Sequence, residues 1–190
     1  MTSDEVLELF KSTGALLEGH FILTSGYHSP YYFQCAKVLQ YPRHNKIFAA
    51  AISRKFYNKD INVVVSPAVG GIVFGTAVGS QLGARTIFTE RENGEMTLRR
   101  GFEIKEDENV LICEDVVTTG GSVFEIIDIV KENKANLIGV GFIIDRSNGK
   151  VDFKTKQYSL AKLEVKNFKE DELPDWLSKI PVTKPGSRIF

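Results

Sequence analysis

Residues 110–122, Val-Leu-Ile-Cys-Glu-Asp-Val-Val-Thr-Thr-Gly-Gly-Ser, constrain the fold of this chain more than any other segment. The apolar run Val110–Cys113 is typical of a parallel strand that is covered on both faces. A helix is predicted to follow, because the next apolar residues repeat at the spacing of one helical face. These residues are Val123, Ile126, Ile127 and Val130. A buried strand that turns directly into an amphipathic helix is a basic unit of α/β folds.

The turn between this strand and helix offers a site for an anion. Unpaired backbone N–H groups and the helix dipole favour negative charge at a helix N-terminus, and glycines let a ligand approach the backbone. Glu114 and Asp115 stand just before the turn, where they would repel a phosphate. Their presence makes sense if they bind sugar hydroxyls or help to hold a metal, so the segment predicts a site for a phosphorylated ribose. The structural alternative is an ordinary turn with a Thr/Ser cap. Neither a Walker P-loop nor a Gly-x-Gly-x-x-Gly fingerprint is present.

Composition narrows the class of protein. The 190 residues, 43% of them hydrophobic, suffice for one domain with a substantial core. The net charge is zero, from 24 basic and 24 acidic residues, which argues against broad capture of nucleic acid or an anionic membrane. No apolar run reaches the length of a membrane span, and the acidic start is unlike a secretory signal. Two cysteines, Cys35 and Cys113, are too few for a disulfide framework or a zinc cluster. We therefore expect a cytoplasmic enzyme or binding protein.

Strand-like and helical segments alternate along the chain, which predicts a parallel α/β sheet with helices on both faces. The expected strands are 61–65, 85–89, 110–113 and 137–144, and the expected helices are 43–57, 71–82 and 122–133. Ligands of such sheets bind beyond the carboxyl ends of the strands. Four segments should therefore meet on one rim: 66–71, 90–101, 114–122 and 145–149.

Three of these rim segments suggest ligand contacts. Gly70 and Gly71 let the backbone of residues 66–71 approach a second anion, although a tight turn explains them equally well. Residues 90–101 are dense in charge, as a solvated hairpin would be. They also suit a mobile lid whose arginines neutralise a polyanionic leaving group and exclude water. Arg146 ends the fourth strand and suits a planar carboxylate, with a surface salt bridge as the alternative.

Residues 24–34, Thr-Ser-Gly-Tyr-His-Ser-Pro-Tyr-Tyr-Phe-Gln, combine two turn signals with a run of aromatic rings. Aromatic clusters beside turns are more often part of a core or an interface than a platform for a base. His28 is expected to be a surface residue that forms hydrogen bonds locally.

Two of these segments carry a resemblance to a known family. Residues 110–122 are similar to the phosphoribosyl-pyrophosphate (PRPP) motif of the type I phosphoribosyltransferases. The order Ser-Gly-x-x-Ser-Pro-Tyr-x-Phe within residues 24–34 resembles the N-terminal signature of orotate phosphoribosyltransferases. The resemblance covers nearly the whole chain. It implies a single domain, residues 1–190, with the type I fold and a small cap made of residues 1–40 and the tail after about residue 150.

The resemblance implies that the chain joins orotate to PRPP, giving orotidine 5′-monophosphate and pyrophosphate. Glu114 and Asp115 would contact the ribose hydroxyls, and the turn after them would hold the 5′-phosphate. Arg91 is the best counterpart of the family's catalytic lysine, so the implied catalytic residues are Asp115, Glu114 and Arg91. The other PRPP-binding residues would be Val116, Val117, Thr118, Thr119, Gly120, Gly121 and Ser122 in the turn, and Ala68, Val69, Gly70 and Gly71 in the pyrophosphate loop, which often has an unusual peptide geometry in the family.

The implied orotate-binding residues are Ser25, Gly26, Tyr32, Phe33, Thr118 and Arg146. Two departures from the family pattern matter. Thr24 stands where many members have a PRPP-contacting lysine, and the lid bases are arginines (Arg91, Arg99 and Arg100) where orotate enzymes often have lysines and a histidine.

The resemblance also implies Mg²⁺ held mainly through PRPP, without a dedicated protein site, and a homodimer in which one subunit's lid reaches the neighbour's site. Nucleic acid and membranes are not expected partners. Two alternatives stay open. One is a purine or uracil phosphoribosyltransferase of the same fold, and the other is a PRPP-sensing regulator that binds nucleic acid and has lost catalysis.

Overall fold

A six-stranded sheet forms the body of the protein, in a computed structural model that describes residues 1–23 and 26–183. Its strand order is β5-β4-β3-β6-β7-β8, and all neighbouring pairs are parallel except β4 with β5. The strands are β3 (Val63–Pro67), β4 (Arg85–Glu92), β5 (Glu95–Leu98), β6 (Asn109–Val117), β7 (Asn136–Asp145) and β8 (Gln157–Lys162). The predicted α/β class, a mostly parallel sheet flanked by helices, is confirmed.

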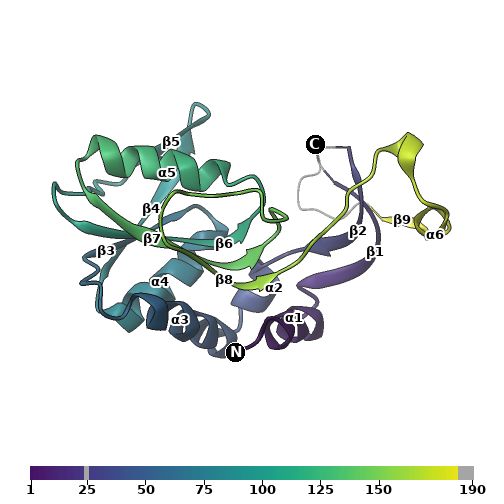
Figure 1. Cartoon of the computed structure of the whole chain (residues 1–190), viewed down its shortest axis with the longest axis horizontal. Coiled ribbons are helices and arrows are strands. Elements are labelled where there is room, and N and C mark those ends of the chain that lie inside the picture. The colour runs from purple at the N-terminus through teal and green to yellow at the C-terminus, as the bar shows by residue number, and fades with distance from the viewer. Residues whose placement is uncertain (24–25, 184–190) are drawn as a thin grey trace.

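Helices cover both faces of this sheet (Figure 1). On one face α3 (Pro42–Phe56) and α4 (Gly70–Leu82) bury the side chains Phe48, Ile52, Phe74 and Val78. On the other face α5 (Gly121–Glu132) buries the four apolar residues that predicted it. The central strands β3 and β6 are apolar on both sides because each of their faces lies under a helix. The three helices and four strands predicted from the sequence are all present, with ends shifted by a few residues.

The small residues of α4 explain why this helix packs so close to the sheet. A Cβ at Gly75 would overlap the Ser66 side chain, and one at Gly79 would overlap the Thr86 side chain. Glycine is needed here because of this contact, since both positions have ordinary helical geometry. The close packing fixes where α4 begins, and its first turn lies at the rim of the sheet.

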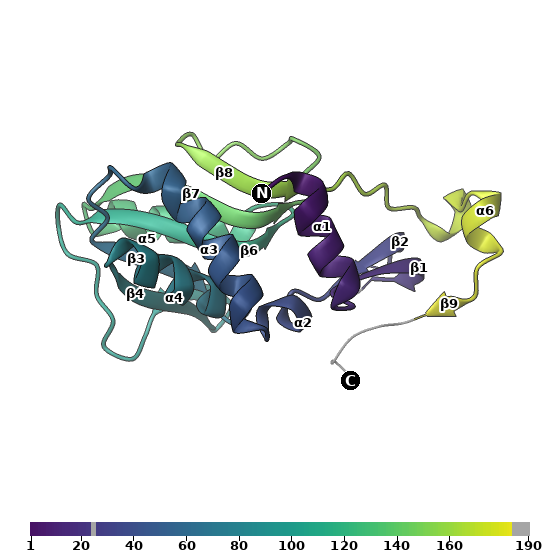
Figure 2. The same ribbon diagram turned by 90° about the horizontal axis from the view of Figure 1, so that it is seen from below.

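A smaller sheet beside the body has the order β2-β1-β9 and forms a cap (Figure 2). Its strands are β1 (Leu16–Ile22), β2 (His28–Phe33) and β9 (Val182–Thr183). The cap also includes α1 (Ser3–Ser12), which has a capping box between Thr2 and Glu5, and α2 (Ala36–Leu39), which leads into the body. The chain after β8 adds a 3-10 turn (Glu170–Glu172) and α6 (Asp175–Ser178).

The tail after Val151 divides between the two sheets. Its first strand, β8, pairs with β7 at the edge of the body, a strand that the sequence pattern did not predict. Only the later part joins the cap, where β9 pairs with β1 and Phe168 pairs with His28. The tail thus straps the cap to the body.

His28 corrects one expectation, because it is buried and not at the surface. Its Nδ1 lies 2.6 Å from Nε2 of His20, which is also buried, and Nδ1 of His20 lies 3.1 Å from the carbonyl oxygen of Ile180. The histidine pair therefore fastens the tail to β1 and β2.

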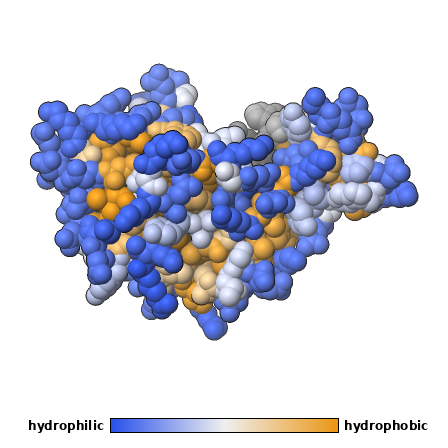
Figure 3. All heavy atoms as spheres, viewed as in Figure 1, coloured by the Kyte–Doolittle hydropathy of each residue, from blue (hydrophilic) through white to orange (hydrophobic). Residues whose placement is uncertain are grey.

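Hydrophilic residues cover most of the face seen in Figure 3, and hydrophobic residues show between them in patches. Within the described residues, the helices are all too short or too polar to cross a membrane.

Candidate functional site

The carboxyl ends of the parallel strands meet at one rim, as the predicted sheet requires. Val117 at the end of β6 pairs with Asp145 at the end of β7, and the N–H of Arg146 donates to the carbonyl of Val117 at 2.8 Å. The N–H of Ala68, just after β3, donates to the carbonyl of Thr89 in β4 at 2.8 Å. Ladder contacts thus hold the rim segments beside one another.

The predicted phosphate turn encloses a small polar pocket of about 70 Å³. It is lined by Glu114, Val116, Val117, Thr118, Thr119, Gly120, Gly121, Ser122 and Val123. Gly120 directly precedes α5 and has a φ of +77°, a backbone conformation that is unfavourable for a residue with a side chain. A Cβ there would also lie 2.9 Å from Phe153. The first N–H groups of α5 have no intrahelical partners and lie at this pocket, so the turn can bind an anion of phosphate size.

Glu114 and Asp115 form the wall of the site next to the turn. Glu114 is buried, and its Oε1 accepts a hydrogen bond from the N–H of Asp115 at 2.9 Å. Oδ1 of Asp115 accepts from the N–H of Val116 at 2.8 Å. Burial raises the pKa of Glu114 well above its usual range, and the neighbouring Asp115 carboxylate raises it further. Two carboxylates this close in a partly dry site suit ligands that donate hydrogen bonds, such as sugar hydroxyls.

The loop after β3 lies directly against these acids. A Cβ at Gly70 would overlap the Asp115 carboxylate, and one at Gly71 would lie 3.2 Å from Oε1 of Glu114. The peptide between Ala68 and Val69 is cis, the kind of unusual geometry that the resemblance implies. The structure therefore brings together three predicted groups: residues 68–71, the two acids and the phosphate turn.

Arg146 faces the cap across the rim. Its guanidinium carbon lies 4.7 Å from the centre of the Phe33 ring, and its Nε is buried without a hydrogen-bond partner among the described residues. Burial lowers the pKa of Arg146 from its usual value. Asp145 does not pair with it, since Oδ1 of Asp145 accepts from the N–H and the hydroxyl of Ser147 at 2.9 and 2.7 Å. An arginine held on an aromatic face with free donors suits a planar anion.

The remaining residues of the predicted base site do not all lie next to Arg146. Tyr32 and Phe33 are consecutive in β2, so their side chains lie on opposite faces of the strand. Tyr32 packs against Phe21, with ring centres 5.8 Å apart, while the ring of Phe33 lies against the Arg146 guanidinium. Gly26 is exposed in a turn, with a φ of +82°. Ser25, together with Thr24, lies outside the described residues.

Residues 90–101 contain an antiparallel hairpin, one of the two structures that the sequence suggested for this segment. Asn93 and Gly94 in its turn both have positive φ. All three arginines have carboxylate partners. Arg91 binds Glu125 of α5 at 2.7 Å, Arg99 lies 3.4 Å from Glu92, and Arg100 binds Glu90 at 2.7 Å. The sequence did not reveal these pairings. Two of the three acids belong to the same charge-dense segment as the arginines, where many pairings are possible, and the third, Glu125, lies outside that segment.

Two further residues lie at the site without having been predicted there. Cys35, two residues after the end of β2, is buried. Burial raises the pKa of its thiol, and the nearby carboxylates of Asp115 and Glu114 raise it further, so the thiol is protonated next to these two acids. Its position immediately after the 24–34 signature is the available sequence signal. Glu125 is the other residue, and its signal is its place one helical turn after Gly121.

The acids at the rim are the candidates for contact with a metal ion. Among residues 1–23 and 26–183, no group of three or more His, Cys, Asp or Glu side chains could hold a metal ion. Glu114 and Asp115 offer two carboxylates, too few for a closed site but suited to Mg²⁺ that is bound largely by other oxygens.

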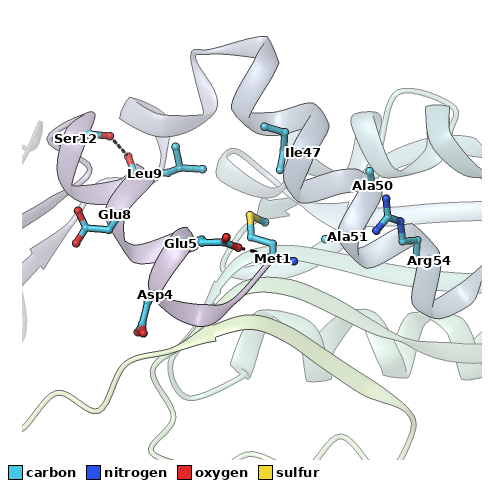
Figure 4. A pocket seen from close by; sticks show the side chains of 10 residues that line it. All are labelled: Met1, Asp4, Glu5, Glu8, Leu9, Ser12, Ile47, Ala50, Ala51 and Arg54. Carbon is cyan, nitrogen blue, oxygen red and sulfur yellow. Dashed lines mark hydrogen bonds and ion pairs between the residues drawn. The ribbon is translucent and has the colours of Figure 1, made fainter.

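A second hollow lies elsewhere, in an open groove of about 900 Å³ between α1 and α3 (Figure 4). Its lining is mainly acidic and apolar: Met1, Asp4, Glu5, Glu8, Leu9, Ser12, Ile47, Ala50, Ala51 and Arg54. Acidic side chains would repel a polyphosphate, so the rim remains the candidate site despite its smaller pocket.

Comparison with known proteins shows the family of this chain. The family described as "Phosphoribosyl transferase domain" matches residues 37–178. An orotate phosphoribosyltransferase of Thermoanaerobacter sp. (strain X514) is 52% identical over 190 residues, covering all of both chains. That of Chlorobium phaeobacteroides (strain BS1) is 55% identical over 188 residues, 99% of this chain and 97% of the relative.

Solved structures support the fold. The orotate phosphoribosyltransferase from Aeropyrum pernix matches with a TM-score of 0.69 at 21% identity, over 83% of this chain and 93% of that one. An adenine phosphoribosyltransferase from Thermoanaerobacter pseudethanolicus matches with a TM-score of 0.62 at 15% identity, over 70% and 88%. Because one architecture serves two different bases, the fold by itself does not select the base.

Proposed function

Because the chain belongs to the phosphoribosyltransferase family, and relatives 52% and 55% identical to it are orotate phosphoribosyltransferases, we propose that it transfers phosphoribosyl from PRPP to orotate. The products are orotidine 5′-monophosphate and pyrophosphate. This is a pentosyl transfer in pyrimidine synthesis.

The observation that carries the proposal is the contact between Gly70 and the Asp115 carboxylate. It puts the proposed pyrophosphate loop against the proposed ribose acids, which adjoin the pocket for the 5′-phosphate. PRPP carries its pyrophosphate, ribose and 5′-phosphate in that order, so the three sites follow the donor from end to end. Arg146 on the same rim supports a base with a carboxylate, which distinguishes orotate from adenine, guanine or uracil.

The reaction depends on orientation and electrostatics and does not need a nucleophilic side chain from the protein. The bond from C1′ to pyrophosphate loosens, C1′ becomes cationic, and N1 of orotate attacks it. Asp115 and Glu114 place negative potential beside the ribose as that charge develops, and they hold its hydroxyls so that C1′ faces the base. The N–H groups of residues 120–122 fix the 5′-phosphate and with it the position of the sugar. Arg91 supplies positive charge for the leaving pyrophosphate.

Mg²⁺ is part of the proposal. When bound with PRPP it would neutralise charge on the leaving pyrophosphate. The rim fits this ion, since Asp115 and Glu114 adjoin both the loop and the sugar position, and Mg²⁺ commonly takes one or two carboxylates and completes its shell with substrate oxygens and water.

We further propose that the protein acts in the cytoplasm as a homodimer with shared active sites. The support is the exposed position of Arg99 and Arg100 in the hairpin, which lets them reach a neighbouring subunit. Several large apolar side chains are also exposed on the body, among them Tyr41, Ile47 and Val73, and a second copy would cover them.

The proposal is tested by following the ultraviolet absorbance of orotate with purified protein, PRPP and Mg²⁺. We expect the orotate band to fall only when all components are present, and chelation of Mg²⁺ to stop the change. If PRPP binds but orotate is not consumed, the base assignment is wrong, and hypoxanthine, guanine, adenine and uracil are then the substrates to assay. A PRPP-binding protein that consumes none of these bases and binds nucleic acid in a salt-dependent way would be a regulator.

A further inference from the structure

Contacts within its own chain hold the hairpin arginine Arg91 in place. In the hairpin it lies opposite Met96, and cross-strand neighbours project from the same face of a sheet. Met96 is buried in the cluster beneath α5, so Arg91 also projects toward α5. Figure 1 shows this hairpin beside the helix. The hairpin therefore has an apolar anchor and a charged side chain directed at the same helix.

Two acceptors hold the Arg91 guanidinium. Nη2 donates to Oε1 of Glu125 at 2.7 Å, and Nη1 donates to the carbonyl oxygen of Gly94 at 2.6 Å. A guanidinium has five N–H donors, so these two bonds leave three for a further ligand. The side chain is 49% exposed, which keeps those donors accessible.

The position of Glu125 links this clamp to the phosphate site. It follows Gly121, the first residue of α5, by four positions, and residues four apart lie on one helical face. One turn of helix rises about 5.4 Å. The guanidinium is thus held beside the helix whose N-terminus forms the phosphate turn.

Glu125 differs from the acids that pair with the other hairpin arginines. Arg99 and Arg100 pair with Glu92 and Glu90, which belong to the hairpin itself, whereas Glu125 belongs to the body. Its second oxygen, Oε2, is buried without a partner among the described residues. A half-buried carboxylate of this kind gains most from a cation that stays in place.

We infer that Glu125 is a positioning residue, which holds Arg91 so that its free donors meet the phosphates of the bound donor substrate. This inference rests on the proposed function for the identity of that substrate. The rival role for Glu125 has the opposite sign: a carboxylate that competes with those phosphates for Arg91 would weaken PRPP binding.

The test compares Glu125→Ala and Glu125→Gln with the wild type, using calorimetry for PRPP affinity and steady-state kinetics for KM and kcat. We expect Glu125→Ala to weaken PRPP binding and raise its KM by about 3- to 10-fold, since a partly exposed charged pair is lost. The KM for orotate should change little. Glu125→Gln retains an acceptor oxygen and should lie between Ala and wild type.

Asp128→Asn is the matched control, because it removes a carboxylate from the same helix whose partner, within the described part of the chain, is the exposed Lys131 at 3.0 Å. It should leave PRPP affinity unchanged. The Arg91→Ala background supplies the decisive comparison, since Glu125→Ala should have no further effect once Arg91 is absent. Melting temperatures of all variants separate a positioning effect from a loss of fold.

Tighter or unchanged PRPP binding in Glu125→Ala would overturn the inference, as would an equal loss in the Arg91→Ala background. Calorimetry keeps this result separate from the base assignment. A wild type that binds PRPP without consuming orotate would overturn the proposed acceptor, while the binding measurements would still decide the role of Glu125.

Discussion

Gly70 and Asp115, 45 positions apart in the chain, are in such close contact that a single methyl group at Gly70 would overlap the Asp115 carboxylate. Gly70 opens α4 at the end of β3, and Asp115 lies near the end of β6, the neighbouring strand. The backbone of one predicted binding segment thus forms part of the surface of another. Glycine is required at this position because a side chain would clash with Asp115. The backbone conformation is not the reason, since the φ of Gly70 is not in the left-handed region.

Gly70→Ala should therefore reduce activity strongly. The added methyl must displace either the Asp115 side chain or the loop, and overpacking of this kind costs about 1–3 kcal/mol. We expect kcat/KM for PRPP to fall by at least about tenfold, the factor that 1.4 kcal/mol represents. Steady-state kinetics and a melting curve check this. Gly121→Ala is the comparison for stability, since a Cβ there meets only Thr119 Oγ1 at 3.8 Å. Activity of Gly70→Ala equal to the wild type would mean that the contact is not part of the working site.

The sequence predicted the parts of this site, because local patterns specify local structure. Four apolar residues on one face specified α5, and the glycines after β3 and β6 marked the turns. The rim followed from the rule that parallel strands end together. The contact between Gly70 and Asp115 could not be predicted in the same way, because it depends on how tightly α4 packs on the sheet.

Other features were missed for similar reasons. Most residues of the strand β8 are partly buried and of mixed character, since it lies at the edge of the sheet, and its pattern is correspondingly weak. The His20–His28 pair joins β1 to β2, and His20 also contacts Ile180 in the tail. No spacing pattern in the sequence predicts these contacts. The Arg91–Glu125 pair depends on the hairpin register.

Arg146 should determine the affinity for the base. Its guanidinium lies on Phe33 with Nε unpaired within the described part of the chain, so a carboxylate can take up a charge-assisted hydrogen bond there. Such bonds are worth about 1.5–3 kcal/mol, or roughly 10- to 100-fold in affinity. We expect Arg146→Ala to raise the KM for orotate by a factor in this range and to leave the KM for PRPP nearly unchanged. Kinetics with each substrate varied in turn measure both, and an equal loss for both would move Arg146 out of the base site.

Asp115→Asn should separate catalysis from stability. The amide keeps the size of the side chain but removes the negative charge beside C1′, so we expect kcat to fall by roughly 10²-fold, as for other groups that stabilise transition-state charge. The melting temperature should stay the same or rise, because the repulsion between Asp115 and the buried Glu114 is relieved. Turnover within a few-fold of the wild type would remove Asp115 from the catalytic residues.

Glu114 should make the free protein less stable as pH rises. Burial, reinforced by Asp115, raises the pKa of this carboxyl in the folded state above its usual value of 4.5. Between the unfolded and the folded pKa, the native protein keeps a proton that the unfolded chain has released. Its stability therefore falls with increasing pH across that window and levels off above the folded pKa.

Glu114→Gln cannot ionise, so this variant should lose that part of the pH dependence. We expect its melting temperature to match that of the wild type near pH 4 and to exceed it increasingly at higher pH, although its activity is reduced by the loss of a ribose contact. Melting curves of both proteins at matched ionic strength between pH 4 and 8 measure the difference. Parallel curves across this range would mean that Glu114 ionises equally well in the folded and unfolded states, and that burial at the rim does not control its proton.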